Sequence, residues 1–282
     1  MIIDAHLHIW DLGRARYPWL TEDAGILHRD HAIEEILPTL SAVGVGGAVL
    51  VQASDEAADT ELMIDVARRH PEVVGIVGWV PLDRPDLVPA ALDGLAEEPL
   101  VVGIRSLVHE LPPGWLAGAA QDESLSMLAA AGLTLDFPTK DPAALAELVA
   151  IGERHPDLGL VVDHLGKPPI GRGEAERAQW RELLAAVAEN PRASAKVSGL
   201  YSAVGDPAAW TVDSLRPFVD DALELFGPGR LMYGGDWPVA RIAGGYERMW
   251  DALGTILEPL DPADRDLVLG GTAERVYRLA GV

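Results

Sequence analysis

Short apolar segments alternate along this chain with longer amphipathic segments, and the alternation repeats eight times. The apolar segments are nearly continuous in Val, Ile, Leu and Gly, which is typical of parallel strands that are covered on both faces. The pattern predicts eight strands, at residues 2–8, 47–53, 73–82, 100–108, 133–137, 159–164, 193–199 and 230–236.

The segments between these strands are rich in Ala, Leu, Glu and Arg at helical spacing. They predict helices at residues 57–70, 85–97, 142–155, 174–190 and 217–226. Asp55, Asp141 and Asp213 precede helical segments and are expected N-caps, and Asp30 is expected to open a further helix that ends near Val43. Two terminal helices, at residues 242–260 and 261–280, are expected to pack on the outside of the fold.

Eight strand–helix repeats without a break in composition predict one α/β domain over residues 1–282, a closed (β/α)8 or TIM barrel. Right-handed crossovers close such a sheet, and eight strands fill their own interior. A doubly wound open sheet is the alternative, but no glycine-rich nucleotide-binding turn follows the first strand. Residues 9–30 form a long first loop, which is expected to shape an active site.

The composition of the chain excludes several classes of binding partner and of catalytic site. The chain has 44 acidic and 22 basic residues and a formal net charge of −22, so its surface repels phosphate backbones. A small-molecule ligand is therefore expected, with no nucleic-acid or membrane partner. Cysteine is absent, which excludes a thiolate nucleophile and a Cys-type zinc site. No apolar run approaches the ~18 residues of a membrane helix and no signal-peptide pattern is present, so a cytoplasmic protein is expected.

Polar and aromatic side chains collect at the predicted carboxyl ends of the strands, where barrel enzymes place their chemistry. A sequence without a site there would scatter such groups over helices and loops. The pattern therefore predicts an enzyme. The residues concerned are His6, His8, Gln52, Trp79, Arg105, Asp136, His164, Lys196, Ser198 and Asp236.

Three histidines and one carboxylate among these residues suit catalysis. His6 and His8 share a strand face with Cα atoms roughly 6.6 Å apart, so they can converge on one metal ion or one substrate oxygen. Backbone partners for both rings are the alternative. Asp236 ends the last strand, which favours a catalytic carboxylate over a cap. Adjacent strand residues face opposite ways, so we expect His164 to face the interior and Asp163 to be a structural partner.

The remaining candidates have both a functional and a structural interpretation. An inward-facing Lys196 is a buried cation that needs an acidic partner. The guanidinium of Arg105 suits carboxylate or oxyanion recognition, or it bridges acidic neighbours. Trp79 and Trp237 either stack on a substrate ring or pack in the core. The other histidines fall in loops or at helix ends and are expected to be solvated, namely His28, His31, His70, His109 and His155.

Four motifs, in order along the chain, resemble the amidohydrolase superfamily. They are DAHLHIWD at residues 4–11, DHLGKP at 163–168, KVSGL at 196–200 and YGGDWPV at 233–239. More narrowly, the chain resembles the branch that contains L-fuconolactonase, L-rhamnonolactonase and the pyrone dicarboxylate lactonases. The similarity runs from residue 2 to about Leu279, which makes it far more specific than a lone His-x-His pair.

The resemblance implies a barrel that hydrolyses a cyclic ester, with Asp236 as the general base. The carbonyl is then polarised by histidine and Arg105, or by a single divalent ion, zinc first, held by His6, His8, His164 and Asp236. Since the pyrone lactonases work without metal, a metal-free site is the alternative. A two-metal site is not expected, because residues 133–140 end without a histidine and the fourth strand offers Arg105. Substrate-binding roles are expected for Gln52, Trp79, Lys196 and Trp237.

The leading functional hypothesis is hydrolysis of a sugar lactone, such as a fuconolactone-like or rhamnonolactone-like aldonolactone, by a monomer or homodimer. A zinc-dependent decarboxylase of an aromatic or unsaturated acid on the same barrel is one alternative. A non-catalytic barrel that binds a small molecule is another.

Overall fold

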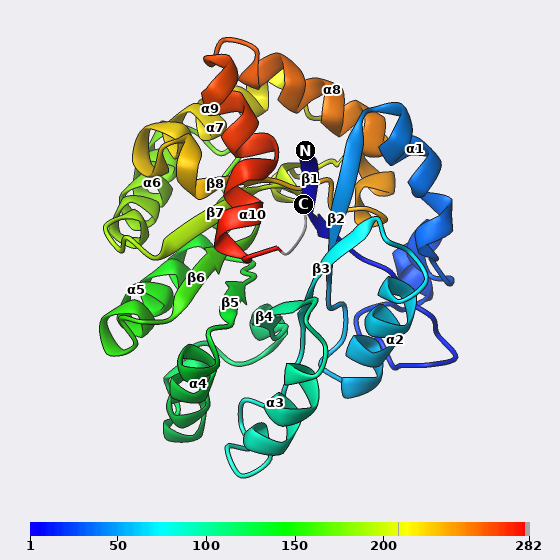
Figure 1. Cartoon of the computed structure of the whole chain (residues 1–282). Helices are drawn as coiled ribbons and strands as arrows, with labels where there is room; N and C mark the ends of the chain where they lie inside the picture. Colours follow the sequence, from blue (N-terminus) through cyan, green and yellow to red (C-terminus); the bar gives the residue numbers. More distant parts are fainter. Residues whose placement is uncertain (208, 280–282) are drawn as a thin grey trace.

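A computed structural model of the chain describes residues 1–207 and 209–279, and its eight strands form one parallel sheet in the order of the sequence. Helices surround the sheet on the outside, as Figure 1 shows in a view along the barrel. The predicted TIM barrel is confirmed. The strands are β1 (Ile2–Leu7), β2 (Val45–Val51), β3 (Val73–Gly78), β4 (Val101–Arg105), β5 (Thr134–Phe137), β6 (Gly159–Val162), β7 (Ala193–Val197) and β8 (Leu231–Tyr233).

Helices follow the strands in alternation, and short 3-10 turns extend several of the loops. The helices are α1 (Leu37–Ala42), α2 (Ala57–Ala67), α3 (Val88–Ala96), α4 (Ala119–Ala131), α5 (Leu145–Arg154), α6 (Glu174–Ala188), α7 (Val212–Phe226), α8 (Tyr246–Leu257), α9 (Pro262–Asp266) and α10 (Thr272–Val276). No helix in the described part of the chain is both long and apolar enough to cross a bilayer.

One of the four predicted helix starts is confirmed. The Asp141 side chain accepts from the Ala143 amide at 2.9 Å and caps the helical turn before α5. Thr211 caps α7 instead of Asp213, which lies in the first turn of that helix. The Asp55 carboxylate accepts instead from the Leu107 amide, across the loop that follows β4. The Asp30 carboxylate holds the Leu12 amide within the first loop, and α1 begins only at Leu37.

The barrel closes between β1 and the segment directly after β8. The Asp236 amide donates to the His6 carbonyl at 2.8 Å, and the His8 amide donates to the Trp237 carbonyl at 2.7 Å. The Asp4 carboxylate spans the same seam, because it accepts from the Gly235 amide at 3.0 Å and from the His6 amide at 2.9 Å. Closure of the sheet therefore brings the first and last site motifs side by side.

The C-terminal segment corrects the expectation that both terminal helices pack on the outside. A π-helical turn (Leu267–Gly271) and α10 contact β1 and β8 at the end of the barrel where the strands begin. Figure 1 shows α10 at this end, close to the N-terminus. The buried Tyr277 ring joins the interior cluster of the barrel, and its hydroxyl donates to Asp136 Oδ2 at 2.6 Å. The strands do not fill the interior alone. Ala280, where the second helix was expected to end, lies outside the described residues.

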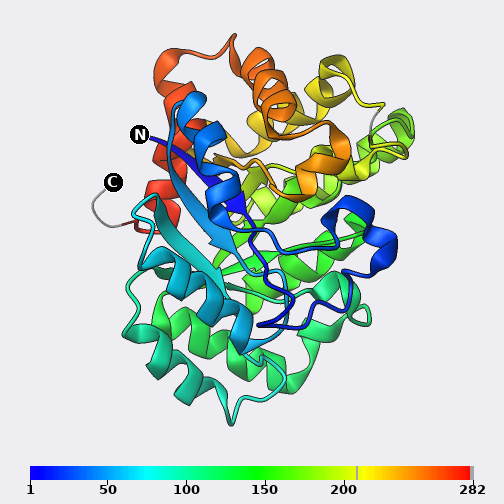
Figure 2. The same cartoon turned by 90° about the vertical axis from the view of Figure 1, so that its right-hand side faces the viewer.

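Figure 2 shows the two ends of the barrel from the side. The dark-blue segment that follows β1 lies at the opposite end from the red α10. One end is therefore closed by the C-terminal segment, and the long first loop lies at the end where the strands finish.

Candidate active site

A cavity of about 220 Å³ lies at the carboxyl ends of the strands. A cavity of this volume has room for a small-molecule ligand of about the size of one monosaccharide ring. The long first loop contributes Trp19 to the wall, as expected of a loop that shapes a site. The residues that line the cavity include His8, Trp19, Arg105, His109, His164, Lys167, Ser202 and Asp236.

Three potential ligand atoms converge at the seam of the barrel. His6 Nε2 lies 3.1 Å from His8 Nε2, and Asp236 Oδ1 lies 3.8 Å from the first and 3.5 Å from the second. In a tetrahedral zinc site with ligand distances of about 2.0–2.1 Å, ligand atoms are separated by about 3.3 Å. The spacing and the chemistry of this donor set therefore fit one divalent ion.

Backbone and carboxylate partners orient the two histidine rings. His8 Nδ1 lies 2.7 Å from the Val51 carbonyl, so the ring donates there and leaves the Nε2 lone pair free. His6 Nδ1 lies 3.1 Å from Lys196 Nζ and 3.3 Å from Asp163 Oδ1, so these two groups fix the ring with Nε2 directed at His8 and Asp236. Burial lowers the pKa of His6 well below its usual value despite the neighbouring Asp163, so the ring is neutral. Ligand histidines in metal proteins are commonly held in this way.

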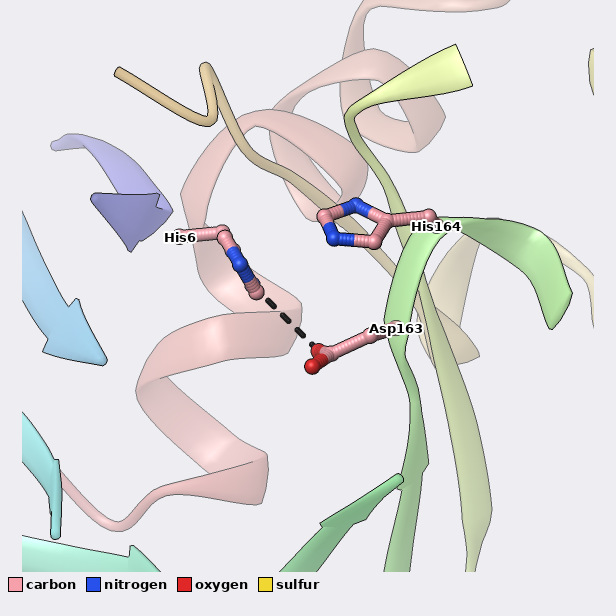
Figure 3. Close-up of side chains that lie close together, drawn as sticks. All are labelled: His6, Asp163 and His164. Atoms are coloured by element: carbon pink, nitrogen blue, oxygen red, sulfur yellow. Dashed lines mark ion pairs between the residues drawn. The ribbon is translucent and has the colours of Figure 1, made fainter. Parts of the chain in front are cut away.

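The turn after β6 corrects the expectation that Asp163 and His164 cannot both face the interior. The strand ends at Val162, and His164 takes a left-handed conformation with φ 54°, so strict alternation stops there. Figure 3 shows His6, Asp163 and His164 gathered together, with Asp163 directed at His6. His164 Nδ1 is hydrogen-bonded to Ser198 Oγ at 2.9 Å, and its ring centroid lies 4.6 Å from that of His6.

A second set of potential ligands, formed by His6, Asp163 and His164, also lies within 4.8 Å. This second set suits an ion less well, because Asp163 already forms ion pairs with Arg105 Nη1 at 2.9 Å and with Lys196 Nζ at 3.1 Å. Burial opposes ionisation of Asp163, but Lys196, His6 and Arg105 hold its pKa well below the usual range. His164, expected beside the other three ligands, falls in this second set.

Beneath the cavity lies a fully buried charged layer. Lys196 Nζ lies 2.6 Å from Asp136 Oδ2 and 3.1 Å from Asp163 Oδ1, so the acidic partner expected for an inward lysine is present twice. Thr134 Oγ1 also donates to Asp136 at 3.0 Å. Buried charges are retained only when they are paired and hydrogen-bonded, and this layer meets that requirement.

Asp236 is held by several groups at once. The Tyr201 hydroxyl donates to Oδ2 at 2.6 Å, which leaves Oδ1 directed at the two histidines. Burial raises the pKa of this carboxyl, but the neighbouring His164, His8 and His6 outweigh burial and lower the pKa below its usual value. Asp236 is therefore ionised and able to accept a proton or bind a cation.

Glycine is required where β7 ends. Gly199 has φ 55°, and a Cβ atom there would collide with His164 Nδ1 and lie 2.7 Å from Asp236 Oδ2. Any side chain at this position would separate two of the site residues.

The structure brings His6, His8, Arg105, His164 and Asp236 together, and it places the four expected substrate-binding residues elsewhere. Lys196 has no exposed surface and lies in the charged layer. The side-chain amide of Gln52 donates to the Arg105 backbone carbonyl at 2.9 Å, and the backbone carbonyl of Gln52 accepts from Arg105 Nη2 at 2.6 Å. The Trp237 ring packs edge-on against His31. Trp79 follows the end of β3 and lines a separate cavity with residues of α2 and α3.

Several functional candidates were missed by the sequence analysis. Lys167 stands within the DHLGKP motif at residues 163–168, and Trp19 lies in the long first loop that was expected to shape a site; these were the only signals for the two residues. Tyr201 follows the Gly199–Leu200 pair without any pattern that marks it. His109 was expected to be solvated, yet it lines the cavity, and burial lowers its pKa to about 3. His31 is likewise buried, with 1% of its surface exposed.

Comparisons with known proteins find relatives that match nearly the full length of the chain. A family model described as amidohydrolase matches residues 3–279. An L-fucono-1,5-lactonase from Burkholderia ambifaria is 33% identical over 98% of this chain and 95% of its own length. An L-fucono-1,5-lactonase from Burkholderia multivorans is 30% identical over 98% and 96%. The crystal structure of an amidohydrolase from Burkholderia multivorans with bound zinc superimposes with a TM-score of 0.91, at 29% identity over 99% of both chains.

Proposed function

This chain belongs to the amidohydrolase family, and from that membership and the site we propose that it hydrolyses the cyclic ester of a sugar lactone. The observation that carries the proposal is the convergence of His6, His8 and Asp236 on one point beside a monosaccharide-sized cavity. The two similar fuconolactonases, matched over nearly their full length, support an aldonolactone as the substrate class.

Hydrolysis of a lactone needs a base that activates water. Asp236 is ionised, is held by Tyr201 through one oxygen, and keeps Oδ1 beside the histidines. We assign Asp236 as the group that takes a proton from the attacking water. A lactone is a good electrophile, so a weak base of this kind is adequate when the carbonyl is polarised.

Arg105 is assigned to the oxygen of the lactone carbonyl. It lines the cavity, and its position is fixed by Asp163 at 2.9 Å and by the Gln52 carbonyl at 2.6 Å. Its Nε atom is buried and has no hydrogen-bond partner among the described residues, so the guanidinium keeps a free donor. A donor fixed near a developing oxyanion typically contributes about 10²–10³-fold in rate.

A divalent ion, with zinc as the expected metal, would be held by His6, His8 and Asp236. When bound, such an ion polarises the carbonyl and lowers the pKa of a bound water toward about 7. The zinc in the similar Burkholderia multivorans structure supports this assignment. His164 stays beside these ligands, fixed by Ser198, as a neutral hydrogen-bonding group toward the substrate.

A panel of aldonolactones that includes L-fucono-1,5-lactone tests the proposed function, with acid release followed by a pH indicator. We expect turnover of at least one member well above the spontaneous rate. Folded protein that releases no acid from any member would contradict the proposal, and release of CO₂ from an aromatic acid would support a decarboxylase instead.

Elemental analysis tests the metal assignment without reference to activity. We expect about one divalent ion per chain in the purified protein, and loss of that ion in a His8→Ala variant, because one of three donor atoms is removed. His28→Ala, at an exposed histidine of the first loop, serves as the control and should keep the ion. Equal metal content in the wild type and His8→Ala would contradict the assignment.

A further inference from the structure

Lys167 is a cationic side chain on the cavity wall to which the proposed function gives no role. It is half-buried, and its Nζ donates to Ser202 Oγ at 2.8 Å. Within residues 1–207 and 209–279 no carboxylate forms an ion pair with it. The other two lysines of the chain are both paired, Lys140 with Glu110 and Lys196 with buried aspartates.

The backbone at Lys167 is strained. His164, Leu165, Gly166 and Lys167 are four consecutive residues with positive φ, at 54°, 51°, 68° and 61°. Only glycine adopts this region without a steric cost, yet three of the four residues carry a Cβ atom. Non-glycine residues that persist in such a conformation cluster at functional sites. The turn places His164 and Lys167 on the same cavity.

Opening a lactone places negative charge on two oxygens in succession. The first is the carbonyl oxygen, for which Arg105 and the metal-binding residues provide stabilisation. The second is the ring oxygen, which leaves as an alkoxide and needs a proton. Arg105 approaches the cavity from the end of β4, whereas Lys167 approaches from the turn after β6. Lys167 is therefore available to the second oxygen.

We propose that Lys167, positioned by Ser202, donates a proton to the ring oxygen of the lactone as the ring opens. The assignment rests on the proposed function. Water attacks the carbonyl carbon, and Asp236 takes one of its protons. The bond between the carbonyl carbon and the ring oxygen then breaks, its electron pair stays on the ring oxygen, and Lys167 Nζ supplies the proton. Protonated Asp236 returns its proton to the Lys167 amine, and the product acid ionises to solvent.

Two features of the surroundings support this role. The Ser202 hydroxyl accepts the hydrogen bond from Lys167 and itself donates to the Gly199 carbonyl at 2.6 Å, so the position of Nζ is fixed. Burial lowers the pKa of Lys167, whereas the negative charge of Asp236 raises it. Lys167 and Asp236 both line the cavity, through which the proton returns.

The test compares two leaving groups in variants that lack the ammonium. Lys167→Met and Lys167→Gly are assayed with L-fucono-1,5-lactone, whose leaving oxygen is an alkoxide, and with dihydrocoumarin, whose leaving oxygen is a phenolate. A phenol has a pKa near 10 and leaves without a proton donor more readily than an alkoxide does. We expect kcat to fall by about 10²–10³-fold with the sugar lactone and by less than about 10-fold with dihydrocoumarin.

Further variants separate chemistry from folding. Glycine suits the left-handed conformation at this position, so Lys167→Gly should fold at least as well as the wild type. Added ethylammonium should restore activity to this variant, because it returns an ammonium to the vacated space. Arg172→Met removes an exposed positive charge from the same loop and should keep wild-type kcat.

Each outcome decides the assignment. A larger loss with the sugar lactone than with dihydrocoumarin, or rescue of Lys167→Gly by ethylammonium, supports it. Equal losses with both substrates and no rescue, or unchanged kcat in both variants, overturn it while the proposed function stands. A wild-type protein that hydrolyses no lactone contradicts the proposed function itself.

Discussion

Replacing Asp236 with asparagine is expected to reduce lactone turnover by about 10³–10⁴-fold, at the upper end of what a general base contributes. The amide has the same shape, but it cannot accept the proton of the attacking water or offer an anionic oxygen to an ion. Asp236 has φ 53°, a conformation that asparagine tolerates, so the fold should be retained. The measurement is kcat with the best lactone of the panel, alongside the thermal unfolding midpoint.

Asp213→Asn provides the matched control, because Asp213 is exposed in the first turn of α7, outside the cavity. This variant should keep wild-type kcat. An Asp236→Asn protein with undiminished turnover would remove Asp236 as the base, whatever the metal content.

Replacing Lys196 with methionine is expected to destabilise the protein by about 3–5 kcal/mol, because removal of one partner leaves buried charge uncompensated. Among the described residues, Asp136 would keep Tyr277 and Thr134 as donors, and Asp163 would keep Arg105 as its cationic partner. The free energy of unfolding in urea, followed by circular dichroism, measures the effect.

A second substitution identifies the cause. Adding Asp136→Asn to Lys196→Met should recover part of the lost stability, since it removes the carboxylate that the lysine neutralised. Lys140→Met, at a mostly exposed lysine, should change the free energy of unfolding by less than about 1 kcal/mol. Similar stability of Lys196→Met and the wild type would show that the charged layer does not depend on this lysine.

Much of the site was predictable because a parallel barrel converts strand order into spatial proximity. All five site residues lie near or just past the ends of strands, so their gathering at one end follows from the topology: His6, His8, Arg105, His164 and Asp236. The same argument could not separate cavity residues from those beneath the cavity. Gln52 and Lys196 end up buried because depth depends on how far each strand extends before it turns.

Side-chain direction beyond a strand end was not predictable from alternation. Trp79 lies one residue past β3 and faces the groove between α2 and α3. Asp163 lies one residue past β6 and faces the barrel interior. In each case the period of two ends with the strand, and the dihedral angles of the following turn set the direction.

The sequence by itself determined the barrel, the order of its strands and the set of strand ends that carry chemistry. These features arise from the local periodicity of apolar residues and from the limited ways in which parallel strands can be connected. The tertiary structure decided how the ligand atoms converge. The Asp4 carboxylate accepts a hydrogen bond from the Gly235 amide, 231 residues away in the sequence. The Tyr277 hydroxyl donates to Asp136, which is 141 residues away. Contacts of that range depend on closure of the whole barrel, which no local pattern encodes.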